Sequence, residues 1–265
     1  MLDMNHNPQI ARLQLVLSLT RRELINQYAG TTFGLLWTVL SPLLLMAIYT
    51  LVFTQFFAAR WPGHESSSYF AMNLFLGLMI HTATATSLNK ATVVIFAESG
   101  IISNVSFPSI TFIFSTVLST IPQLIGSLIV LVGLLFLIDH SFSPLILLLP
   151  LVLLPFYIAL TSLCLIVSSA GAYLRDITMV MPFVTTAMLF MSPVFYTIEM
   201  IPAPYHQIVQ LNFLTIPIEF ARQLIIDGTM IDLKLLAIYS LLSILSYFVG
   251  HLVYRKLSRG FMDVL

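Results

Sequence analysis

The stretch PLILLLPLVLLPFYIALTSLCLIVSSAGA, residues 144–172, contains no Asp, Glu, Lys or Arg. A helix needs about 20 mostly apolar residues to cross the roughly 30 Å hydrocarbon core of a membrane. A single Asp, Lys or Arg at the centre of such a helix costs about 2.5–3.5 kcal/mol on insertion scales. The stretch therefore predicts a membrane-spanning helix.

The same pattern recurs along the chain. Only 8% of the 265 residues are charged, against about 25% in a soluble domain, and the mean hydropathy is +0.99. The charge-free stretches of at least 20 residues are 24–59, 66–89, 99–138, 140–174, 177–198 and 235–254. We therefore predict an all-α polytopic membrane protein that forms one transmembrane domain over residues 1–265.

Six spans are expected within these stretches, with boundaries set by the flanking polar residues. Their predicted ranges are 34–57, 70–91, 109–137, 144–172, 178–197 and 235–254.

Two further segments are expected outside the spans. Residues 8–29 have apolar side chains on one face, which predicts an amphipathic helix lying in the membrane surface; a cytosolic helix packed on a partner is the alternative. Residues 198–233 are too polar to span and too apolar for a free loop, so we expect short helices that dip into the membrane surface.

Lys and Arg are distributed unevenly between the two sides of the predicted membrane. Six spans place both termini on the same side, and cytoplasmic loops carry an excess of Lys and Arg. One side collects Arg12, Arg21, Arg22, Lys90, Arg175, Arg255, Lys256 and Arg259, and the other collects Arg60, Arg222 and Lys234. This bias predicts that both termini are cytoplasmic and that 198–233 lies on the outer face.

Signatures of catalysis and of cofactor binding are missing from the sequence. None of the three lysines follows a glycine, so there is no phosphate-binding loop of the Gly-x-x-x-x-Gly-Lys type, and no common hydrolase or metalloprotease motif occurs. The chain also has no metal-ligand spacing of Cys and His, and its net charge of zero gives no indication of nucleic-acid binding. We expect a chain without catalytic residues, metal or cofactor of its own.

His81 is the candidate ionisable side chain in the middle of the second predicted span. Ion-coupled carriers keep ionisable groups in the membrane as proton relays, so His81 is a candidate for a proton-coupled carrier or an intramembrane enzyme. The alternative is a hydrogen-bonded histidine at a contact between helices.

Aromatic side chains are concentrated in the first and fifth predicted spans. Their faces can stack on the apolar faces of sugar rings, or they can belong to the aromatic belts that contact lipid. The candidates for lining a path are Trp37, Tyr49, Phe53, Phe183, Phe190 and Tyr196. Pro42 and Pro193, each preceded by serine, predict kinks in the same two spans.

Several short motifs in chain order resemble one known family. They are Arg21-Arg22-Glu23-Leu24, Tyr28-Ala29-Gly30, Gly34-Leu35-Leu36-Trp37, Ser41-Pro42, Asn104-Val105-Ser106-Phe107-Pro108, Tyr173-Leu174-Arg175-Asp176, Ser192-Pro193-Val194-Phe195-Tyr196 and Asn212 with Pro217 and Glu219. Together they resemble the membrane-spanning (permease) subunits of ABC-type polysaccharide exporters, which export O-antigen, capsule or teichoic-acid chains. Gly30-Thr31-Thr32-Phe33-Gly34 departs from the Gly-Ser-x-Leu-Gly of that family.

The resemblance implies an assembly of a second copy of this chain with two copies of a separate ATPase, which would bind ATP and Mg. It implies that residues 93–107 dock on that ATPase as a coupling helix and that 198–233 forms gate helices. The candidate coupling residues are Glu98, Ser99, Gly100, Ser103 and Asn104.

The expected function is export of a lipid-linked polysaccharide, first of all O-antigen, across a bacterial inner membrane. Arg21 and Arg22 are candidates for contacting the phosphate of the carrier lipid. The alternatives are an ABC-type exporter of capsule, teichoic acid, a drug or a small lipid, and, outside this class, the proton-coupled carrier or enzyme built on His81.

Overall fold

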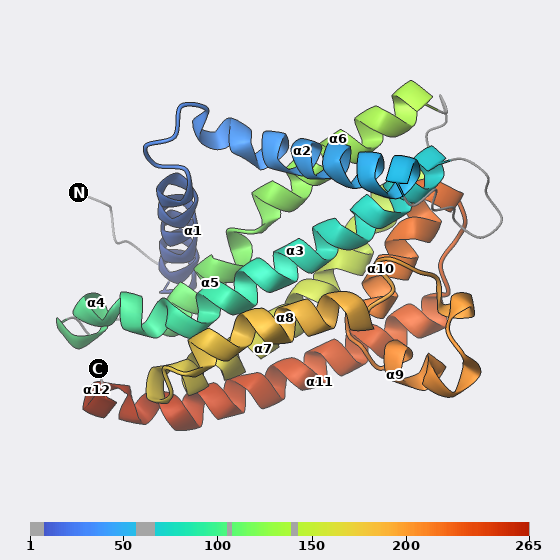
Figure 1. Cartoon of the computed structure of the whole chain (residues 1–265). Helices are drawn as coiled ribbons and strands as arrows, with labels where there is room; N and C mark the ends of the chain where they lie inside the picture. The colour runs from blue at the N-terminus through green and yellow to red at the C-terminus, as the bar shows by residue number, and fades with distance from the viewer. Residues whose placement is uncertain (1–7, 57–66, 105–107, 139–142, 265) are drawn as a thin grey trace.

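The computed structural model describes residues 8–56, 67–104, 108–138 and 143–264. Within these ranges the secondary structure is helical throughout and contains no strand. This confirms the prediction of an all-α protein. In Figure 1 most of the long helices run lengthwise through one elongated bundle, and α1 stands across its end.

The helices fall into long elements that form the bundle and short ones that connect them. The long elements are α1 (Pro8–Gln27), α2 (Trp37–Leu51), α3 (Ser67–Ala97), α5 (Ile110–Leu118), α6 (Ile121–Ile138), α7 (Leu149–Tyr173), α8 (Ile177–Met191) and α11 (Leu233–Leu257). The short ones are η1 (Gly34–Leu36), η2 (Val52–Phe56), α4 (Ser99–Asn104), η3 (Pro144–Leu148), η4 (Ile198–Met200), η5 (Ala203–Tyr205), α9 (His206–Gln210), α10 (Thr215–Arg222), η6 (Gln223–Asp227), η7 (Ser258–Gly260) and α12 (Phe261–Val264).

Among the residues that the structure describes, five stretches are long and apolar enough to cross a membrane. They are Gly34–Leu51, Ser68–Ala97, Ile110–Leu137, Pro144–Tyr173 and Leu233–Gly260. The sixth expected span contains α8, which has 15 residues and is therefore about 22 Å long. The structure thus gives several membrane-spanning helices, and the count of six stays a prediction.

The second span is longer than the sequence suggested. We expected it to end at residue 91 because Lys90 and the polar residues after it break the apolar pattern, but α3 continues without interruption to Ala97. Lys90 is accommodated because its Nζ donates to Glu23 Oε1 at 2.9 Å and to Gln27 Oε1 at 3.1 Å, both on α1. The predicted coupling segment 93–107 therefore begins as the last turns of α3 and continues as α4.

The third span is broken in its first half. We expected one helix over 109–137, but α5 ends at Leu118 and α6 begins at Ile121. At the break the hydroxyl groups of Ser119 and Thr120 donate to the carbonyls of Thr116 and Val117 at 2.8 and 2.7 Å. Pro122, at the start of α6, supplies no backbone N–H to continue the α5 ladder, which accounts for the interruption.

The fifth span is shorter than predicted. The helix α8 ends at Met191, before Ser192-Pro193, whereas we expected a helix to residue 197. The residue before a proline is driven away from helical geometry, and Ser192 is extended, with φ −104° and ψ 155°. The chain then packs Val194 against Gly77 of α3, where a Cβ on Gly77 would lie 3.0 Å from the Val194 Cα.

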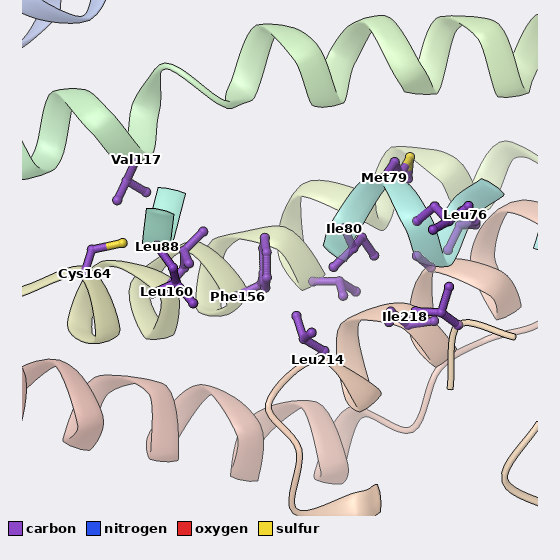
Figure 2. Packing of buried hydrophobic residues seen from close by; sticks show 14 of the residues in the cluster. Leu76, Met79, Ile80, Leu88, Val117, Phe156, Leu160, Cys164, Leu214 and Ile218 are labelled. Carbon is purple, nitrogen blue, oxygen red and sulfur yellow. The ribbon is translucent and has the colours of Figure 1, made fainter. Parts of the chain in front are cut away.

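The long helix α7 is the centre of the fold, between α3 and α11. A Cβ on Gly171 of α7 would lie 2.3 Å from the Thr92 carbonyl oxygen of α3, and one on Gly250 of α11 would lie 2.6 Å from the Ser162 hydroxyl of α7. Small residues allow helix backbones to approach closely in membranes, where packing replaces the hydrophobic effect as the driving force. Figure 2 shows buried side chains of α3, α5, α7 and α10 meeting beside this axis.

Candidate functional site

A cluster of charged side chains joins α1 to the end of α3 and the start of α4. Arg22 of α1 pairs with Glu98, and Lys90 of α3 pairs with Glu23 of α1. The guanidinium of Arg22 also lies 5.9 Å from the centre of the Phe112 ring of α5. These side chains are only partly buried, so each ion pair contributes about 0–1 kcal/mol to stability. Their structural consequence is that α1 is fastened to the predicted coupling segment.

The two arginines predicted to contact lipid phosphate differ in their surroundings. Arg21 is exposed and forms no ion pair with any described residue. Arg22 is half-exposed and is held by Glu98, which is itself one of the predicted coupling residues. The structure therefore brings two separately predicted sites together through this one pair.

The remaining coupling candidates lie on α4. Ser99 begins this helix, Gly100 is exposed, and the Glu98 carbonyl accepts the backbone N–H of Ile101 at 3.0 Å. Ser103 and Asn104 form the end of α4, and their side chains lie outside what the structure describes. As Figure 1 shows, α4 projects from the same end of the bundle as α1 and α12.

Sequence analysis missed a second contact at this end. The guanidinium of Arg175, in the turn between α7 and α8, lies 4.4 Å from the centre of the Phe96 ring at the end of α3. The sequence analysis considered Arg175 for its charge and as part of a family-like motif, because nothing in the sequence pairs it with an aromatic ring about 80 residues earlier. The contact links the start of α8 to the predicted coupling segment.

The predicted aromatic path separates into a cluster and isolated residues. Phe53 is at the centre of the cluster: its ring lies 6.4 Å from Tyr49, 5.6 Å from Phe70 and 5.9 Å from Phe195. Phe195 in turn stacks on Phe190 at 5.6 Å. Phe70 and Phe195 were not among the predicted path residues, and both are placed there by tertiary packing between α2, α3 and the segment after α8.

The other aromatic candidates do not join this cluster through a ring contact. Trp37 contacts Phe33 edge-to-face at 6.0 Å, near the start of α2. Phe183 is 77% exposed on α8. Tyr196 is close to the cluster, because its hydroxyl donates to the Phe190 carbonyl at 2.9 Å.

A buried arginine holds together the opposite end of the bundle. Arg222 of α10 is 3% exposed and donates to Glu219 Oε1 at 2.9 Å, to the Val194 carbonyl at 3.1 Å and to the Asn73 carbonyl of α3 at 3.3 Å. Burial raises the pKa of Glu219 above its ordinary value, while the Arg222 charge opposes that rise. Nearby, the Tyr69 hydroxyl donates to Asp227.

Arg222 thus ties α10 to α3 and to the segment that follows α8. The sequence signal was weak: an arginine three residues after Glu219 within a mostly apolar run. The sequence analysis considered it only for its charge, because the carbonyls of Asn73 and Val194 that it contacts belong to distant parts of the chain.

His81 occupies a contact between helices. Its Nε2 lies 2.9 Å from the Thr185 carbonyl oxygen of α8 and therefore carries the hydrogen of that bond. This matches the alternative of a hydrogen-bonded histidine between helices. No group of His, Cys, Asp or Glu suited to a metal ion occurs among the described residues.

The helices and contacts described so far define a class: a multi-helix membrane protein in which α1 is joined by ion pairs to the end of α3 and the start of α4. Residues 14–226 match the family model described as ABC-2 type transporter. The match covers most of the chain, and the protein therefore belongs to the ABC-2 type transporter membrane family. Members of this family are multi-pass permease subunits that associate with an ABC ATPase subunit.

Three curated relatives share the name O-antigen export system permease protein RfbA. Two are from Klebsiella pneumoniae, each 24% identical, over 261 and 254 residues, and each alignment covers 95% of both chains. The third, from Myxococcus xanthus, is 28% identical over 190 residues, which covers 71% of this chain and 70% of the relative. The chain is therefore similar to the two Klebsiella permeases along almost its whole length.

Proposed function

We propose that the protein is the transmembrane subunit of an ATP-driven exporter that moves a lipid-linked polysaccharide, O-antigen in the first instance, across a bacterial inner membrane. The observation that carries this proposal is the similarity to O-antigen export permeases over 95% of both chains. A shared domain alone would give a partial match, whereas this similarity includes the interfacial helix, the spans and the short helices before the last span.

The proposal assigns ATP hydrolysis to a separate partner chain, and the working assembly to two copies of this subunit with two ATPases. The absence of a phosphate-binding loop from the sequence supports this division of labour. Both termini lie on the cytoplasmic side in this scheme, together with α1 and α4, and α9 and α10 lie on the outer side. The Lys and Arg bias supports that orientation.

The contacts between helices support a route from the ATPase to the membrane. In the proposal α4 docks on the ATPase, so a movement of α4 is passed to α1 through the Arg22–Glu98 pair and to the start of α8 through the Arg175–Phe96 contact. The helices α2, η2 and α8 carry the aromatic residues Tyr49, Phe53 and Phe190, over which the sugar chain passes. Arg21, exposed on α1, contacts the phosphate of the carrier lipid.

The test is reconstitution. The purified chain and its partner ATPase from the same bacterium are placed in proteoliposomes with lipid-linked polysaccharide, and transport is followed with and without ATP. The proposal expects transport that needs both chains and ATP. Transport by this chain alone, or transport of small hydrophobic compounds in preference to the glycan, would contradict it.

A further inference from the structure

A small hollow lies in the middle of the helix bundle, between α2, α3 and the α5–α6 break. Its volume is about 50 Å³. The residues that line it are Pro42, Leu45, Tyr49, Phe75, Leu78, Met79, Thr82, Ala83, Thr120, Gln123, Leu124 and Ser127. Because Leu45 is 42% exposed, the hollow is open on one side rather than sealed.

The hollow lies where the midpoints of three candidate spans meet, which the proposed topology puts at the centre of the membrane. Three of the lining residues lie within one residue of the middle of a candidate span. They are Pro42 in Gly34–Leu51, Thr82 in Ser68–Ala97 and Gln123 in Ile110–Leu137. Three helices therefore bring their midpoints together at this place. Polar side chains at such depth are expensive and mark pathways or binding sites in membrane proteins.

Three hydrogen-bonding side chains from three different helices line this hollow without a partner. Tyr49, Thr82 and Gln123 form no side-chain hydrogen bond with any residue that the structure describes. Most other hydroxyl groups in the spans donate back to their own helix; Thr84, two residues after Thr82, donates to the Ile80 carbonyl at 3.1 Å. The hollow thus gathers unsatisfied polar groups where the cost of leaving them unsatisfied is highest.

We propose that Tyr49, Thr82 and Gln123 form a hydroxyl-binding site at the centre of the membrane, which takes the hydroxyl groups of the exported sugar chain. This inference rests on the proposed function. A sugar ring has a hydroxyl-bearing edge and an apolar face. The amide and hydroxyl groups of the site suit the edge, and the aromatic cluster that begins with the Tyr49–Phe53 contact suits the face.

The small size of the hollow agrees with passage rather than storage. A volume of about 50 Å³ admits hydroxyl groups or a few water molecules but not a whole sugar ring. A binding site in a conduction path has to bind the conducted group strongly enough for it to enter and weakly enough for it to leave. Water molecules occupy the site between sugars, and each passing hydroxyl group replaces one of them.

The break between α5 and α6 explains why the site exists at this depth. The turn at Ser119 and Thr120 ends α5, and α6 then begins with Pro122 near its start, so that Gln123 lines the hollow beside Thr120. On the opposite wall Pro42 leaves the Thr38 carbonyl without its usual partner within the helix. A Cβ on Gly126 of α6 would lie only 2.4 Å from that oxygen, so α2 and α6 meet closely just beside the hollow.

The test compares the triple variant Tyr49→Phe, Thr82→Val, Gln123→Leu with the control Thr84→Val. The triple variant keeps the volume of the side chains and removes their hydrogen-bonding groups. Each variant replaces the wild-type gene at its native locus in the host bacterium. The rate at which polysaccharide appears on the cell surface is measured by metabolic labelling. The melting temperature of each purified protein is measured in detergent. Gln123→Leu alone is measured beside them, in case the triple variant does not accumulate.

We expect the triple variant to slow the appearance of surface polysaccharide at least tenfold while its melting temperature stays at or above the wild-type value. Replacing unpaired polar groups by apolar groups of the same shape is neutral or stabilising. Gln123→Leu should show the same pattern with a smaller effect, and Thr84→Val should leave export unchanged.

Unchanged export in both the triple variant and Gln123→Leu would overturn the site, since the hollow would then hold water only. A fall in export that is accompanied by a lower melting temperature would also overturn it, because the groups would then be structural. Deletion of the whole gene separates this inference from the proposed function: if deletion leaves surface polysaccharide intact, the proposed function fails, whatever the variants do.

Discussion

Replacement of Arg222 by methionine tests how the α9–α10 end of the bundle is held together. Methionine keeps the length of the side chain and removes its charge and donors. Arg222 is 3% exposed, and the change removes its bonds to Glu219, Asn73 and Val194. It also leaves the carboxylate of Glu219, which is 28% exposed, without this partner.

The size of the effect follows from this burial. Breaking a buried ion pair by removing one partner costs about 3–5 kcal/mol. Because Glu219 keeps some contact with solvent, we expect the lower end, about 3 kcal/mol. At about 2–4 °C per kcal/mol for a chain of roughly this size, the melting temperature should fall by roughly 6–12 °C.

Thermal unfolding of the purified protein in detergent measures this shift. The double variant Arg222→Met, Glu219→Leu removes the stranded carboxylate as well, so it should recover part of the loss. Lysine in Arg222→Lys keeps the charge but lacks the planar guanidinium that reaches two carbonyls and a carboxylate. The melting temperature of this variant should therefore lie between those of wild type and Arg222→Met. The reasoning is refuted if Arg222→Met has the melting temperature of wild type. It is also refuted if the double variant melts no higher than Arg222→Met.

Three further predictions concern other contacts. Reversing either charge of the Arg22–Glu98 pair should cut ATP-driven transport at least fivefold, and the double reversal Arg22→Glu, Glu98→Arg should restore most of it; equal loss in all three proteins would show that the pair transmits nothing. Arg21→Ala should weaken transport with the fold intact, measured against Arg12→Ala, which lies about half a turn round α1. Gly171→Ala should lower the unfolding free energy by about 1–3 kcal/mol, because the new Cβ would lie 2.3 Å from the Thr92 carbonyl oxygen; Gly133→Ala, where nothing lies within 4 Å, is the control.

The sequence was most informative where a single helix determines the outcome. Charge-free stretches located the long apolar helices. The free energy of placing a charged side chain in hydrocarbon is larger than almost any local conformational preference of the chain. The proline-broken residues 198–233 contain short helices, and α1 occupies the predicted interfacial segment. The all-α architecture follows from this evidence alone.

The errors in helix boundaries arose where distant parts of the chain compensate for a local signal. Lys90 suggested the end of a span, yet α3 continues through it because Glu23 and Gln27 of α1 supply its partners. The break before Ile121 and the early end of α8 had local signals in Pro122 and Pro193. We interpreted Pro193 as a kink, but the structure ends the helix before it.

Most of the candidate site depends on tertiary contacts that no spacing reveals. Nothing in the sequence pairs Arg22 with Glu98, 76 residues later, or brings Phe70 and Phe195 to Phe53. The predicted path residues Trp37 and Phe183 share aromatic character with this cluster but lie elsewhere. Residue type identified candidates, and packing decided which of them meet.

The account is tested most directly by ATP-dependent transport of lipid-linked polysaccharide into proteoliposomes that contain this chain and its partner ATPase. We predict transport when both chains and ATP are present, and none when either chain or ATP is omitted. Glycan movement by this chain alone, or none by the complete assembly with ATP and substrate supplied, would contradict the central claim.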